Sequence, residues 1–203
     1  MKALSGLVLV LVLCSALPAS AADITDYFRL YHAQHIAPSK VARVLDLLDE
    51  TPAKILTASP SRQVTIDRAN GYLHVVDSSG TDQVLTAALY RKSDGEQLLA
   101  VGGSNCADAC NFSIGFFAIS GDRLQPVALD AVVPAVEPSR FIKPGRTGPG
   151  NAPEINYVPA RVGTSLTLKP WYGYEVEAQM SKATRAALQD VVLTWDRASG
   201  RFR

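Results

Sequence analysis

Closely spaced turn signals between residues 63 and 127 restrict the fold of this chain more than any other feature. Asn70-Gly71 and Asp94-Gly95 are pairs that tolerate the positive φ of a tight hairpin turn. Ser-Gly pairs mark two further turns, at 79–80 and 120–121. Strands joined by such short turns pair antiparallel, so the sequence predicts a meander. The predicted strands cover residues 63–67, 72–77, 83–91, 96–101, 111–119 and 124–127.

Helical patterns precede this meander, between residues 23 and 50. Thr25 is a candidate cap for a first segment, and Pro38 separates that segment from a second helix. The second helix, over residues 39–50, carries an apolar stripe at the spacing of one helix face, formed by Val41, Val44, Leu45 and Leu48. Such a stripe has to pack against another element. We therefore predict an α+β fold in which N-terminal helices pack on a mostly antiparallel meander sheet.

Proline and glycine dominate residues 134–163, where the apolar periodicity disappears. Long connections of this kind are usually exposed functional loops or disordered insertions. We predict a loop insertion at about 134–163 within a single α+β domain over residues 22–203. After the loop, the sequence predicts strands at 165–169, 171–176, 191–196 and 200–202, with a short helix at 181–188.

The first 21 residues have the three parts of a secretory signal peptide. Lys2 gives a positive start, an apolar run covers residues 7–13, and Ala19-Ser20-Ala21 supplies small residues for cleavage. The run is too short to span a bilayer, which needs about 20 apolar residues. A lipoprotein signal ending at Cys14 is the alternative, but bulky Leu13 precedes that cysteine. We expect a periplasmic or secreted protein with no transmembrane segment in its mature chain.

Charge excludes one class of partner. The chain has 20 basic and 19 acidic residues, and removal of Lys2 with the signal peptide leaves a formal charge of zero. A neutral chain lacks the positive field that attracts a phosphate backbone. We therefore expect no binding to nucleic acid.

Two of the three cysteines lie outside the predicted signal peptide. Cys106 and Cys110 fall in the connection 102–110 between two predicted strands, and in an oxidising compartment they most simply form one disulfide. A zinc site would need further ligands nearby, and a redox-active pair would be expected to resemble Cys-x-x-Cys at the start of a helix. The disulfide would either order a glycine-rich connector or pre-organise a loop that contacts a partner.

Histidines supply the weak alternative of a metal site. His32 and His35 are three residues apart on the first helical segment and could hold a metal if a carboxylate, such as Asp23 or Asp26, joined them. The pair lacks the glutamate of a His-Glu-x-x-His helix. His74 lies within a predicted strand, where we expect it on a sheet face. We assign no catalytic residue and expect no cofactor.

Aromatic residues gather at Trp171, Tyr172 and Tyr174. Tyrosine and tryptophan are favoured at recognition surfaces because one rigid side chain offers a large contact area and a polar tip. The other interpretation is core packing between sheet and helix. Both stay open on the sequence alone.

The order of these features resembles that of small exported bacterial proteins of unknown function. It runs from a signal peptide through short helices opening with Asp26-Tyr27-Phe28 and a turn-rich meander to a final strand at 193–196, and the chain ends near Phe202. The resemblance implies a periplasmic or secreted setting and no particular activity.

Export, neutrality and a pinned loop without a catalytic set favour a non-catalytic binding protein of the bacterial envelope. We expect its partner to be another envelope protein, so that this chain acts as an inhibitor or immunity protein. The alternatives are a metal-dependent envelope enzyme or metal carrier that uses His32 and His35, and a structural envelope component without a discrete site.

Overall fold

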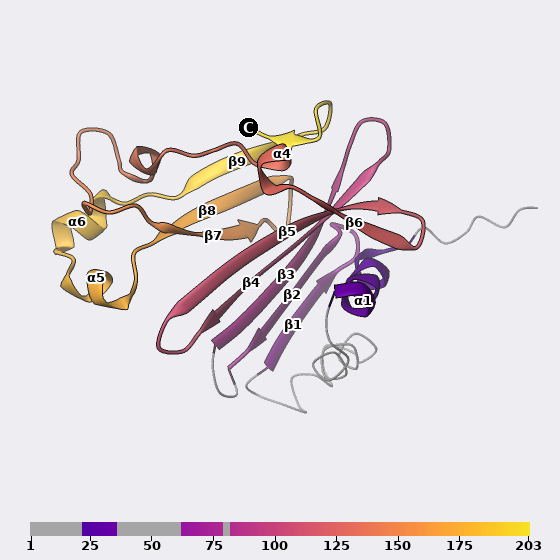
Figure 1. Cartoon of the computed structure of the whole chain (residues 1–203), viewed down its shortest axis with the longest axis horizontal. Helices are drawn as coiled ribbons and strands as arrows, with labels where there is room; N and C mark the ends of the chain where they lie inside the picture. The colour runs from indigo at the N-terminus through magenta and orange to yellow at the C-terminus, as the bar shows by residue number, and fades with distance from the viewer. Residues whose placement is uncertain (1–21, 36–61, 79–81) are drawn as a thin grey trace, which may run out of the picture.

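The computed structural model describes residues 22–35, 62–78 and 82–203 (Figure 1). The predicted signal peptide and the helix predicted over 39–50 lie outside the described residues. The elements are, in chain order, α1 (Ile24–His35), β1 (Arg62–Asp67), β2 (Tyr72–Asp77), β3 (Asp82–Arg91), β4 (Gln97–Cys106), β5 (Cys110–Ser120), β6 (Arg123–Val127), α4 (Leu129–Val132), the 3-10 helix η1 (Pro138–Phe141), β7 (Glu154–Pro159), β8 (Ser165–Trp171), α5 (Tyr174–Gln179), α6 (Lys182–Ala187), β9 (Val191–Asp196) and β10 (Arg201–Phe202).

The predicted meander is confirmed. Strands β1 to β6 form one six-stranded antiparallel sheet in which each strand pairs with the next along the chain. The turns lie where the sequence places them, since Asp67 pairs with Tyr72 and Arg91 pairs with Gln97. Gly71 has a φ of 61° and Gly95 a φ of 92°, positive values that residues other than glycine rarely adopt.

Side chains of this sheet alternate between two buried faces. One face carries Leu73, Leu99 and Phe117, which pack with Ile24 and Phe28 of α1. The other face packs against the second sheet through the large apolar side chains Tyr72, Tyr90, Leu98, Phe116, Leu166, Leu168, Leu193 and Trp195. Helix α1 contacts β2, β3 and β6, and Figure 1 shows the second sheet on the opposite side of the meander. The predicted fold class, a helix packed on an antiparallel meander, is therefore confirmed.

The second sheet has four antiparallel strands in the order β10-β9-β8-β7. Strands β8 and β9 and helix α6 occur close to their predicted positions. Residues 171–176 do not continue as the predicted strand. Gly173 turns the chain with a φ of 84°, and helix α5 starts at the next residue.

Helix α1 begins at Ile24, two residues earlier than a cap at Thr25 would allow. The carboxylate of Asp23, not the hydroxyl of Thr25, accepts the free amide at the helix start, with 2.7 Å between Thr25 N and Asp23 Oδ1. Asp26 Oδ2 reciprocally accepts from Asp23 N at 2.9 Å, which completes a capping box. The prediction that Thr25 is the cap was wrong because Thr25 itself lies within the helix.

The predicted loop at 134–163 contains ordered structure. Strand β7 lies within it, flanked by Pro153 and ending at Pro159. Proline is tolerated there because β7 is an edge strand that pairs only with β8. Residues 141–143 are also tied to the end of α6, since Lys143 N donates to Ala187 O at 2.8 Å. The prolines and glycines therefore predicted a loop where the chain contains an edge strand and a segment hydrogen-bonded to α6.

Strands β4 and β5 are longer than predicted and run as far as the two cysteines. Gly102 and Gly103, predicted to be loop, pair with Thr86 and Leu85 inside the sheet. A Cβ atom at Gly103 would lie 2.7 Å from the backbone oxygen of Val84. Glycine at this position therefore permits two strands to approach closely, and does not make a flexible connector.

Gly103→Ala is accordingly expected to lower the free energy of unfolding by about 1–3 kcal/mol, because the new methyl group meets backbone that cannot move aside cheaply. Gly150→Ala is the matched control, since a Cβ atom there meets nothing within 4 Å. Urea denaturation followed by circular dichroism measures both. Equal stability of the two variants would contradict the prediction.

Candidate functional site

A disulfide closes the tip of the β4–β5 hairpin. Cys106 and Cys110 are directly opposite each other in the strand register, with 4.0 Å between their Cα atoms, and their sulfurs are bonded as predicted. Between them, Ala107 N donates a hydrogen bond to Ala109 O at 3.1 Å. Ala107, Asp108 and Ala109 are all exposed. The hairpin therefore exposes a three-residue tip whose backbone is fixed by the disulfide and by this hydrogen bond.

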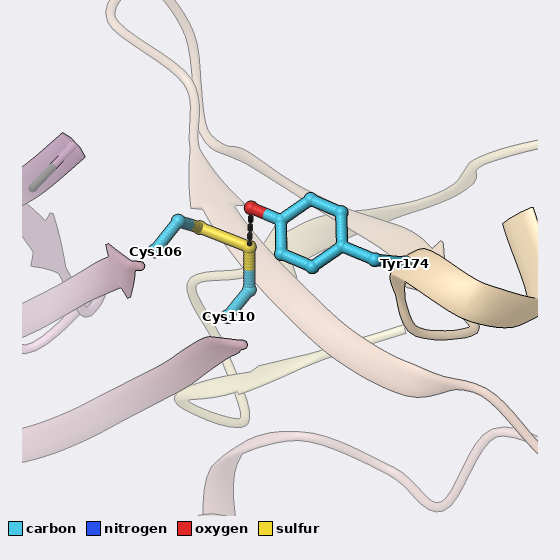
Figure 2. Close-up of a disulfide and its surroundings, with 3 residues drawn as sticks. All are labelled: Cys106, Cys110 and Tyr174. Atoms are coloured by element: carbon cyan, nitrogen blue, oxygen red, sulfur yellow. Dashed lines mark hydrogen bonds between the residues drawn. A yellow bond between two sulfur atoms is a disulfide. The ribbon is translucent and has the colours of Figure 1, made fainter. Parts of the chain in front are cut away.

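The two sulfurs have different surroundings. Cys110 is 8% exposed and belongs to the buried residues, whereas Cys106 is partly exposed. The hydroxyl of Tyr174 lies 3.3 Å from Cys110 Sγ, and Figure 2 shows the phenol pointing at that sulfur. A disulfide sulfur carries no hydrogen, so the phenol is the donor. Cys110 therefore accepts a hydrogen bond from Tyr174, whereas Cys106 has no such donor among the described residues.

Aromatic rings connect the hairpin tip to the second sheet. Trp171, at the end of β8, meets Tyr174 edge to face with 5.0 Å between ring centroids. Trp171 also meets Phe112 of β5 in the same way at 6.2 Å. We call residues 106–110 together with Phe112, Trp171 and Tyr174 the hairpin-tip patch. Tyr174 is 45% exposed, so its ring is available on the surface as well as bonded to the sulfur.

The turn at Gly173 positions these rings. Because Gly173 adopts a φ of 84°, the chain leaves β8 sharply and Tyr174 becomes the first residue of α5. Tyr172, which lies between Trp171 and Tyr174 in the sequence, is instead buried with 6% exposure. The aromatic group noted in the sequence is therefore divided between the two interpretations: Tyr172 packs in the interior, and Tyr174 lies at the surface. Sequence reasoning did not identify Tyr174 as the partner of the disulfide.

One acidic residue lies in the patch and another lies directly beside it. Asp108 is the central residue of the tip, and Glu175 directly follows Tyr174; both are exposed. Neither forms a salt bridge with any of the described residues. Glu177, two residues after Glu175, instead has the guanidinium of Arg185 at 3.9 Å. The patch and the adjoining Glu175 therefore combine aromatic surface with two carboxylates that have no ionic partner in the described part of the chain.

The two histidines of the metal alternative have different environments on α1. His32 is buried, and its ring meets Phe28 edge to face at 4.5 Å. His35 is exposed and lies against Tyr31 and Phe117. Within residues 22–35, 62–78 and 82–203, no three histidine, cysteine or acidic side chains are grouped as metal ligands. The metal hypothesis thus stays a prediction that lacks a third ligand in the described part of the chain.

The carboxylates near α1 have other roles. Asp23 caps the helix and also accepts from Arg68 Nε at 2.7 Å. Burial alone would raise the pKa of Asp23, but hydrogen bonds from Thr25, Asp26 and Arg68 together lower it. Asp26 lies six residues before His32, about 9 Å along the helix axis at 1.5 Å per residue. Neither carboxylate is placed to complete a site with both histidines.

His74 lies on a sheet face, as the sequence predicts. Its Nδ1 is 2.9 Å from Thr86 Oγ1 on the neighbouring strand β3. Burial lowers the pKa of His74, so the neutral ring is favoured. No acidic side chain bonds to this pair among the described residues, and the arrangement does not form a serine-type triad.

An apolar hollow of about 290 Å³ lies between α4, the segment that follows it, and strands β7 and β8. Its lining consists of Leu129, Asp130, Val133, Pro134, Ala135, Val136, Ile155, Tyr157 and Leu168. The hollow does not bring together an acid, a base and a nucleophile. Five of its lining residues belong to the predicted loop at 134–163, but none of the cysteines, histidines or clustered aromatic residues noted in the sequence lines it. It offers hydrocarbon surface and no identifiable chemistry.

Comparisons with other proteins support the fold and leave the activity open. The chain matches no known family and no curated protein sequence. Its structure is similar to that of a domain of an uncharacterized protein from Porphyromonas gingivalis W83, with a TM-score of 0.55 and 11% sequence identity. That likeness covers 90% of this chain and 98% of the other. In the described residues, no helix combines the length and apolarity that crossing a bilayer requires. The fold is thus shared with an uncharacterized bacterial protein domain.

Proposed function

We propose that this chain is an exported, non-catalytic binding protein of the bacterial envelope, and that the hairpin-tip patch contacts a protein partner. The observation that carries the proposal is the closed tip itself, whose three exposed residues are held by the disulfide beside the half-exposed ring of Tyr174. A loop ordered before binding loses less conformational entropy on association. Tyrosine and tryptophan beside such a loop are the residue types that most often dominate binding energy.

The chemistry of the patch selects a class of partner surface. Aromatic rings at Trp171 and Tyr174 favour an apolar anchor, and the carboxylates of Asp108 and Glu175 favour a neighbouring basic group. We therefore propose a partner that presents an aromatic or aliphatic side chain next to lysine or arginine. If the partner is an envelope enzyme with these groups on its surface, this chain acts as its inhibitor or immunity protein.

Tyr174→Ala is expected to weaken partner binding by about tenfold or more, because it removes exposed ring area at the centre of the patch. The partner is first isolated from envelope extract with the immobilised mature protein, and binding of the purified pair is then measured by calorimetry. Val192→Ala is the matched control, since Val192 is 58% exposed on β9 and lies outside the patch. The proposal fails if no saturable partner is retrieved, or if both variants bind it equally.

The exported state has its own test. Mass spectrometry of the native protein should find a mature chain beginning at Ala22 in the envelope fraction. A chain that retains Met1 inside the cell would overturn this part of the proposal.

A further inference from the structure

We propose that the Cys106–Cys110 disulfide undergoes exchange with external thiols, with Cys106 as the attacked sulfur and Cys110 as the leaving sulfur. The sequence spacing alone favours a structural disulfide, but the structure adds a donor aimed at one sulfur. The proposal stands on the surroundings of the sulfurs and does not rest on partner binding.

Access distinguishes the two sulfurs. An attacking thiolate approaches one sulfur from the side opposite the other, so the attacked sulfur must be reachable. Cys106 is partly exposed and is followed by Ala107, whose methyl group is small and exposed. Cys110 is 8% exposed and covered by Tyr174. Cys106 is therefore the cysteine that an external thiolate reaches more easily.

Tyr174 favours the same direction of cleavage. When the S–S bond breaks, its electron pair passes to Cys110 Sγ, which becomes a thiolate. The phenol already donates to this sulfur at 3.3 Å, and a hydrogen bond to a charged acceptor is stronger than one to a neutral acceptor. Trp171 packs edge to face on the Tyr174 ring, which holds the donor in place. The stabilisation is thus greatest where negative charge develops.

The exchange balances without any other reactant. A thiolate forms a new S–S bond with Cys106, the old S–S bond breaks, and Cys110 leaves as a thiolate that Tyr174 hydrogen-bonds. A second thiolate can then release Cys106 from the mixed disulfide. Two thiols are oxidised to one external disulfide, and the protein disulfide is reduced to two thiols.

Asp108 gives the site a preference among thiols. Asp108 is the central residue between the two cysteines, and its exposed side chain has no ionic partner among the described residues. An attacking thiol with excess negative charge is repelled there, and one with an ammonium group is attracted. The substrate class is therefore a cationic thiol, such as a cysteine flanked by basic residues in a protein.

The direct test uses the oxidised, folded protein with cysteamine as a cationic thiol and glutathione as an anionic one. After brief reaction, free thiols are alkylated and the peptides are mapped by mass spectrometry. The expected result is the cysteamine adduct on Cys106 and the alkyl group on Cys110, with cysteamine faster than glutathione per thiolate. An adduct mainly on Cys110 would overturn the assignment.

Tyr174→Phe keeps the ring and removes only the donor, so disulfide opening should slow by about tenfold or more. Tyr27→Phe, on α1 at the other face of the meander, should open at the wild-type rate. Equal rates for the two variants, both folded by circular dichroism, would overturn the role of Tyr174. So would an opening rate that is independent of thiol concentration and equal to the rate of global unfolding. The exchange assay contains only this protein and a small thiol, so its failure would leave the proposed partner binding untouched, and failure to retrieve a partner would leave the exchange proposal untouched.

Discussion

Replacing Trp195 with alanine is expected to lower the free energy of unfolding by about 3–5 kcal/mol. Trp195 lies on β9, is 4% exposed, and packs against Tyr90 and Phe202 with ring centroids 5.3 Å and 5.2 Å away. Its indole N–H donates to Arg91 O at 2.9 Å, so the residue also joins the second sheet to the end of β3. Alanine would leave a cavity between the two sheets and an acceptor without its partner.

Trp195→Phe is the matched control for this prediction. It keeps an aromatic ring against Tyr90 and Phe202 but loses the hydrogen bond to Arg91, so a smaller loss of about 1–2 kcal/mol is expected. Urea denaturation followed by circular dichroism measures both variants. A loss below about 1 kcal/mol for Trp195→Ala would show that the packing between the sheets does not depend on this residue.

The meander could be predicted because its information is local. Turn pairs such as Asn70-Gly71 and Asp94-Gly95 fix where the chain reverses, and alternation of side chains fixes which residues face inward. An antiparallel hairpin needs no distant segment to specify it. The same reasoning was wrong at residues 102–110, where Gly102 and Gly103 were assigned to the loop although they lie in a strand. A glycine required for close approach of two backbones has the same appearance in a sequence as a glycine required for flexibility.

Strand β7 was missed because its stability comes from pairing with β8 and from packing across the meander. Prolines at 153 and 159 remove donors, which argues against a central strand but permits an edge strand. Whether a segment becomes an edge strand depends on a neighbour that starts six residues after it ends. The local pattern therefore indicated a loop.

The candidate site was only half predictable. The disulfide follows from two cysteines four residues apart, since no other cysteine lies outside the predicted signal peptide. The contact between Cys110 and Tyr174 joins positions 64 residues apart, and no spacing in the sequence encodes it. It depends on how the second sheet packs on the meander and on the turn at Gly173. The nearest available signal was the aromatic group at 171–174, which is compatible with either core or surface.

Acid is expected to destabilise this protein through His32. The ring is 2% exposed, and neither of its nitrogens has a hydrogen-bond partner in the described residues. Burial lowers the pKa of His32 from its usual 6.5, because the charged ring would lose its hydration without gaining a partner. The unfolded chain therefore takes up a proton at a higher pH than the folded chain does.

The sign of the pH dependence follows from this difference. Above the unfolded pKa of 6.5, His32 is neutral in both the folded and the unfolded state, so its protonation does not affect the free energy of unfolding. As the pH falls below that value the unfolded state gains a proton first, so stability is lost until the folded pKa is also passed. Burial lowers the pKa of His74 as well, so His74 contributes in the same direction.

His32→Phe should reduce this loss, because it keeps a ring against Phe28 and cannot be protonated. The free energy of unfolding is measured by urea denaturation at about pH 7.5 and about pH 5, on either side of the ordinary histidine pKa. His35→Phe adds the same ring to the same helix but leaves His32 in place, so the acid-induced loss should persist in it. If His32→Phe loses as much stability on acidification as the unaltered protein, the buried ring of His32 is not the acid-sensitive group.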